Sequence, residues 1–83
     1  MSLKYEIRPR KDRRGVNLIS EKLPYGVVWY GEPNAVEHAA SYAQFNAGSE
    51  AAIISILDGS GLIVEARNYT PAEGPDANTL GRL

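Results

Sequence analysis

The chain has 83 residues, a net charge of −1 and no cysteine, and 43% of its residues are hydrophobic. This length predicts a single small domain with a marginal core, because such a chain buries only about 60% of its unfolded surface. The lack of cysteine and the single histidine exclude disulfides and the usual Cys/His zinc sites. Self-association is then the remaining way to stabilise so small a core.

Three short β-patterns open the chain and predict strands at residues 3–8, 16–20 and 27–30. In the first, Tyr5 and Ile7 alternate with charged residues, as in a half-buried strand. A charged loop that closes at a glycine leads to the second strand. A turn with proline and glycine separates the second strand from the third, whose sequence VVWY is a dense β-forming run.

The stretch from Pro33 to Ala47 carries the one long helical pattern. At about 100° per residue, small apolar side chains fall on one stripe, namely Val36, Ala39, Ala40, Ala43 and Ala47. This flat face predicts a helix that lies close to a sheet. Asn34 and Glu37 have the spacing of a capping box, and Gly48 fits a left-handed C-terminal cap.

The opposite side of this predicted helix carries His38, Tyr42 and Phe45, where a lone surface helix would be polar. An exposed aromatic cluster is informative because monomers rarely keep one. Two interpretations stay open: loops or the C-terminal tail cover these side chains, or a second copy of the chain packs on them. With Trp29 of the third strand, they form the predicted self-association interface.

Two further strands follow the helix. Residues 51–57, AAIISIL, form the most continuously apolar run and predict a central strand covered on nearly both faces. The turn at residues 58–61, DGSG, predicts a hairpin, and residues 62–67 return as the fifth strand. In that strand we expect Leu62, Val64 and Ala66 to alternate with Ile63, Glu65 and Arg67. Residues 70–83 are expected to be a flexible C-terminal tail.

The predicted fold is therefore α+β: a five-stranded β-β-β-α-β-β mixed sheet with one helix packed on one face, formed by residues 1–69. The other face of the sheet then needs a cover. Tyr5 or its neighbours, Trp29 and Ile63 are the candidates for that second surface. Apolar side chains on both faces of a sheet with one helix again favour pairing between copies, and a homodimer is the expected state.

The best candidate binding cluster is basic, with five cationic side chains within seven positions: Arg8, Arg10, Lys11, Arg13 and Arg14. Such a loop predicts salt-dependent contacts with phosphates, with Tyr5 and Tyr25 as stacking partners. Asp12 interrupts the run and the pI is about 5.7, so solvated loop charge is the alternative interpretation. Residues 1–22 hold seven basic and three acidic side chains, which also suits an acidic protein partner or a second copy.

We expect no enzymatic activity, no catalytic residues, no cofactor and no metal site. His38 is the only conventional base near neutral pH, and Glu37 and Ser41 beside it on a helix point apart. The turn at Asp58 lacks the repeated acidic positions of a calcium loop. No run has the length of a membrane span and no apolar signal core is present, so we expect a cytoplasmic protein without membrane contact.

Three stretches resemble one known family: YEIRPRKDRRGVNL, AVEHAASYA and DGSGLIVEARNY. The family comprises short bacterial domains classed only as a domain of unknown function, and the resemblance covers residues 4–69. It departs at the second strand, where the family usually carries a tryptophan directly after the glycine and this chain has Val16. The resemblance implies a β-rich sheet with one helix and implies no activity.

The sequence therefore predicts a small non-enzymatic α+β domain that self-associates and acts as a binding or accessory module. The alternative is a weak, salt-dependent nucleic-acid-binding domain that uses the loop from Arg8 to Arg14.

Overall fold

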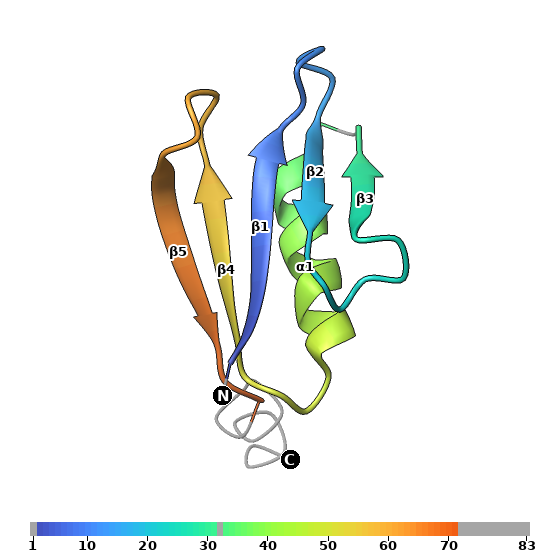
Figure 1. The fold of residues 1–83 in the computed structure, drawn as a ribbon, viewed down its shortest axis with the longest axis vertical. Helices are drawn as coiled ribbons and strands as arrows, with labels where there is room; N and C mark the ends of the chain where they lie inside the picture. The colour runs from blue at the N-terminus through green and yellow to red at the C-terminus, as the bar shows by residue number, and fades with distance from the viewer. Residues whose placement is uncertain (1, 32, 72–83) are drawn as a thin grey trace, which may run out of the picture.

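The fold is taken from a computed structural model of the chain, which describes residues 2–31 and 33–71. Five strands form one mixed sheet in the order β3-β2-β1-β4-β5, and a helix lies against one face of it (Figure 1). The predicted α+β fold with one helix packed on a five-stranded sheet is confirmed. The expected tail, residues 70–83, lies outside the described residues from residue 72 onward.

The elements fall close to their predicted positions, and their ends shift by at most two residues. In chain order they are β1 (Leu3–Pro9), β2 (Val16–Ile19), β3 (Val27–Tyr30), α1 (Ala35–Ala47), β4 (Ala52–Leu57) and β5 (Ile63–Tyr69). In the part of the chain that the structure describes, no helix is long and apolar enough to cross a membrane.

β1 occupies the centre of the sheet, between β2 and β3 on one side and β4 and β5 on the other. It pairs antiparallel with β2, where Ile7 lies opposite Leu18, and parallel with β4, where Tyr5 lies opposite Ile54. A parallel pair cannot be joined by a tight turn. The chain therefore passes from β3 through α1 to β4, and this passage places the helix over the sheet.

The core lies between α1 and the sheet. Ala39 and Ala43 of the helix and Leu18 and Ile54 of the sheet are all 0% exposed. Because the alanine face carries no long side chains, the helix backbone lies close to the strands, as the stripe of small residues predicts. Val36, which belongs to the predicted stripe, is only partly buried and packs at the margin of this core.

Both ends of the helix differ from the prediction. Asn34 precedes the helix, but its side chain makes no capping hydrogen bond, so the predicted capping box with Glu37 is wrong. Glu37 instead forms an ion pair with Arg67 of β5. At the other end Gly48 ends the helix as predicted, with a φ of 64° and its N–H donating to the Gln44 carbonyl at 3.1 Å, but its ψ of −114° lies outside the left-handed helical region of the predicted cap. A glycine adopts this backbone conformation without steric cost.

Three further expectations are corrected by the sheet. Tyr5 faces the helix and is 1% exposed, so it lies neither on the open face nor at a stacking surface. β4 is not covered on both faces, because the helix covers one face and Ile53 on the other is 36% exposed. A register shift between Ile56 and Leu57 makes Val64 an extra residue in β5, which breaks the expected alternation there.

We predict that Ala39→Leu lowers the free energy of unfolding by about 1–3 kcal/mol. The added atoms have no room between the helix and the strands, because Ala39 is fully buried. Urea denaturation measures the change. Gln44→Leu, at an exposed position of the same helix, is the matched control and should change the midpoint little. Equal midpoints for both variants would show that the helix does not pack closely.

Candidate anion-binding groove

The parallel strands β1 and β4 end at the same edge of the sheet, and a groove of about 610 Å³ lies beyond their ends. The end of β1 and the β1–β2 loop line one side with Arg8, Arg10 and Lys11. The β4–β5 turn, residues 58–61, lines the other side. Figure 1 shows both loops at the top of the molecule, beyond the arrowheads of β1 and β4. The groove therefore joins two segments that are far apart in the sequence.

The β1–β2 loop is held by its own hydrogen bonds. The Arg10 N–H donates to the Gly15 carbonyl at 3.0 Å, and the Arg14 N–H donates to Asp12 Oδ1 at 3.0 Å. Gly15 has a φ of 119°, and a Cβ at this position would lie 2.0 Å from the Tyr30 carbonyl oxygen. Only glycine allows β3 to approach the loop this closely.

Arg10 is the best-fixed cation of the loop. Its Nε donates to Asp12 Oδ1 at 3.2 Å, and Nη1 donates to Asn17 Oδ1 at 3.1 Å. Its Cζ lies 5.0 Å from the centre of the Trp29 ring, within the range of a cation–π contact. The hydrogen bonds from Arg10 and from the Arg14 N–H hold the pKa of Asp12 below its usual value. Asp12 therefore stays charged and orders the loop.

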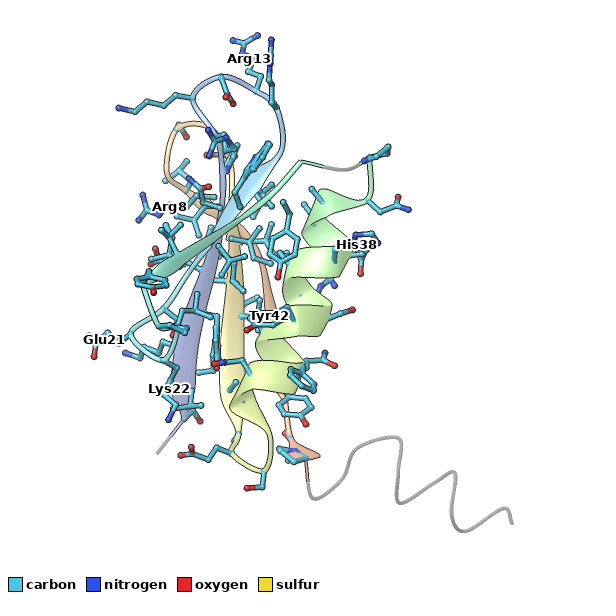
Figure 2. All side chains as sticks on the ribbon, turned by 90° about the vertical axis from the view of Figure 1, so that its right-hand side faces the viewer. Arg8, Arg13, Glu21, Lys22, His38 and Tyr42 are labelled. Carbon is cyan, nitrogen blue, oxygen red and sulfur yellow. The ribbon has the colours of Figure 1, made fainter. Side chains whose placement is uncertain are left out.

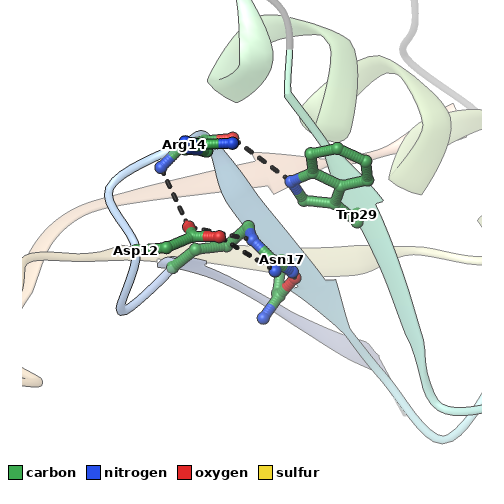
Figure 3. Close-up of polar contacts among 5 residues, drawn as sticks. Asp12, Arg14, Asn17 and Trp29 are labelled. Carbon is green, nitrogen blue, oxygen red and sulfur yellow. Dashed lines mark hydrogen bonds and ion pairs between the residues drawn. The ribbon is translucent and has the colours of Figure 1, made fainter.

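Trp29 links the third strand to this loop. Its Nε1 donates to the Arg14 carbonyl at 3.2 Å, and Figure 3 shows this bond beside the contact between Asp12 and Arg14. The indole lies on the sheet face opposite the helix, because it alternates with Val28 and Tyr30, which pack against the core. Trp29 supports the groove loop from the side and is itself 56% exposed.

The β4–β5 turn is equally well ordered. Asp58 Oδ1 accepts hydrogen bonds from the Ser60 N–H at 2.9 Å, the Ser60 hydroxyl at 2.7 Å and the Leu62 N–H at 3.0 Å. These donors lower the pKa of Asp58 from its usual value. The Asp58 side chain thus shapes the turn, as expected for an Asp-Gly hairpin, and contributes a negative charge to one wall of the groove.

The five predicted basic residues lie at one end of the sheet, and they divide into two groups. Arg8 pairs with Glu6 at 2.9 Å and Arg10 pairs with Asp12, so the charges of both are partly balanced. Within residues 2–31 and 33–71, Lys11, Arg13 and Arg14 form no ion pair. Arg13 lies at the tip of the loop (Figure 2) and lines a second hollow of about 360 Å³ with Lys11. These unpaired cations are the ones available to an anion.

The predicted stacking partners lie elsewhere. Tyr5 is buried against the helix, where its hydroxyl donates to Asn46 Oδ1 at 2.5 Å. Tyr25 is exposed, but it belongs to the β2–β3 turn, at the opposite end of β2 from the basic loop. Trp29 is the aromatic side chain beside the loop, and sequence reasoning assigned it to a different surface.

The structure divides the predicted self-association interface between two faces. Trp29 lies on the open sheet face, while His38, Tyr42 and Phe45 belong to α1 on the other face. Tyr42 is half-buried, with ring centres 6.5 Å from Tyr30 and 6.1 Å from Phe45. Phe45 remains 80% exposed and His38 is exposed. Trp29 therefore cannot share one continuous patch with the helix residues.

Sequence reasoning missed the opposite wall of the groove, which consists of the turn at Asp58, and it missed Asn17. The available signal is the predicted crossover through the helix, which implies a parallel pair of strands in the mixed sheet, and parallel strands end at the same sheet edge. Comparisons with protein-family models, with curated proteins and with solved structures found no match to this chain. Among the described residues, no three acidic or histidine side chains gather as a metal site.

Proposed function

We propose that the chain is a small, non-enzymatic binding module that works as a homodimer. The observation that carries this proposal is the apolar surface of the β4–β5 hairpin. Ile53, Leu62, Ile63 and Val64 make up four of the eight large hydrophobic side chains that are exposed among the described residues. Ile63 and Val64 are 61% and 63% exposed. A second copy that covers them adds the buried surface that a short core lacks.

The position of α1 explains why this hairpin is bare. The helix packs mainly against β1, β2, β3 and β4, and β5 lies beyond it (Figure 1). The absence of cysteine suits a reducing compartment, and we propose that the module acts in the cytoplasm. Phe45 of the helix offers a second, smaller apolar surface for self-association, which is the location favoured by the sequence.

We predict that the mass of the protein in solution rises from one chain, 9.0 kDa, to twice that value as the concentration reaches tens of micromolar. Sedimentation equilibrium or light scattering measures this change. Phe45→Ser should leave the dimer intact if the hairpin forms the interface, and should abolish it if the helix does. A strict monomer over the whole range would refute the proposed homodimer.

A second candidate function, a weak nucleic-acid-binding domain, is favoured by the groove. Lys11, Arg13 and Arg14 lie at one edge of the sheet without ion pairs among the described residues, and Arg10 is held over an indole ring nearby. Cations in such a position bind phosphates through counterion release, which weakens as salt rises. The ordered walls of the groove lower the entropic cost of binding a phosphate backbone.

We predict that the double variant Lys11→Gln, Arg13→Gln reduces the salt slope of nucleic-acid binding by about 2, one for each lost phosphate contact. Fluorescence titrations with single- and double-stranded DNA and RNA at low and high salt measure the slope. Lys22→Gln is the matched control, because Lys22 lies at the opposite end of the molecule (Figure 2). No binding of any of these nucleic acids at low salt would exclude this second function.

A further inference from the structure

We propose that two copies of the chain pair through their β5 strands, antiparallel and centred on Ala66, so that their sheets join into one. This inference rests on the proposed homodimer and specifies the surface and register that form it. The partner is a second copy of the same chain, which adds a strand to the open sheet edge.

The outer edge of β5 is built as an open pairing surface. Among the described residues, β5 has a hydrogen-bonded neighbour on one side only, β4. It spans seven residues, whereas β3 at the other edge spans four. Proteins usually block such an edge with proline, lysine or inward-facing charges, and β5 contains neither proline nor lysine. Its charged residues, Glu65 and Arg67, form an ion pair with each other, so their charges are partly balanced. Its register shift lies near Val64, so residues 65–69 pair regularly with β4.

The sequence of β5 selects the register. A two-fold axis perpendicular to the sheet keeps both helices on one side and centres the pairing on a single residue. Ala66 is the middle residue of Ile63–Tyr69, so pairing about Ala66 overlaps the two strands along their full length. In this register Glu65 faces the partner's Arg67, and Arg67 faces the partner's Glu65. Opposite charges that face each other across strands are stabilising.

Neighbouring registers lack this complementarity. Pairing centred on Glu65 places this carboxylate against its own copy, and pairing centred on Arg67 places two guanidinium groups together. Like charges directly opposite each other are destabilising. Ala66, between them, places the smallest side chain of the strand at the two-fold axis. The charge pattern therefore favours self-pairing in one register and disfavours the adjacent ones.

Arg67 has the donor capacity for the additional contact. Its Nε donates to Glu65 at 2.7 Å, and Nη1 and Nη2 donate to Glu37 at 3.0 and 2.9 Å. Nη2 also donates to Glu65 at 3.5 Å, so the described residues take four of its N–H groups. A guanidinium has five, and one on Nη1 remains for the partner's Glu65. The ion pair with Glu37 holds the side chain above the helix-side face of β5.

A charge exchange tests this register. Glu65→Arg alone and Arg67→Glu alone each place like charges opposite each other twice, so each variant should run at the single-chain mass of 9.0 kDa. In an equimolar mixture every opposing pair becomes complementary, and the doubled mass should return. If both variants alone dimerise as strongly as the unmodified chain, the register is wrong while the proposed homodimer stands.

Ala66→Cys provides the second measurement, because Arg67→Glu also removes the contact with Glu37 and can weaken the fold. The chain has no other cysteine. Residues directly opposite in an antiparallel pair have Cα atoms about 4.5–5.5 Å apart, within the range of a disulfide. Oxidation should therefore link Ala66→Cys into a covalent dimer. Asn68→Cys on the same strand, two residues from the axis, should remain unlinked, and equal linking of both variants would overturn the proposed register.

Discussion

The parallel pairing of β1 with β4 is the constraint on which the rest of the structure depends. It places β1 at the centre of the sheet and requires a crossover, which α1 supplies. The crossover buries the alanine face of the helix against Tyr5, Leu18 and Ile54. The same pairing brings the ends of β1 and β4 to one edge, where their loops enclose the groove. Core and groove thus have one topological cause.

A single helix cannot cover a sheet of this width. A helix with its side chains is about 10–12 Å wide, whereas the axes of five strands spaced by about 4.8 Å span about 19 Å. Because α1 lies over β1, β2, β3 and β4, most of β5 is left without a layer on either face, and only Tyr69 at its end packs against the core. β5 contacts the helix through the ion pair of Arg67 with Glu37 and the hydrogen bond from the Tyr69 hydroxyl to the carbonyl oxygen of Gly48, the C-terminal cap. The exposed apolar surface of the hairpin follows from this geometry.

The sequence predicts the elements well, because each depends on local physics. Alternation defines the strands, the alanine stripe defines the helix, and the Asp58 turn is a strong hairpin signal. The errors concern long-range arrangement. Tyr5 faces the helix and Trp29 faces away from it. The sequence of each strand does not show which face the helix covers, because that depends on the position of the helix. Likewise, Arg10 follows β1 and contacts the ring of Trp29 on β3, although β2 lies between these two strands. No periodicity within either segment reveals that contact.

The groove and the β5 edge are separate surfaces, and their geometry bears on how they combine. β5 runs antiparallel to β4, and a two-fold axis at Ala66 reverses the direction of every strand in the second copy. The groove of that copy therefore opens at the opposite end of the joined sheet. Two such grooves face away from each other and cannot grip one short ligand together. Each groove must therefore bind its ligand with the cations of its own chain. Pairing through β5 buries surface and gives the dimer two separate sites, and neither site gains residues from the partner.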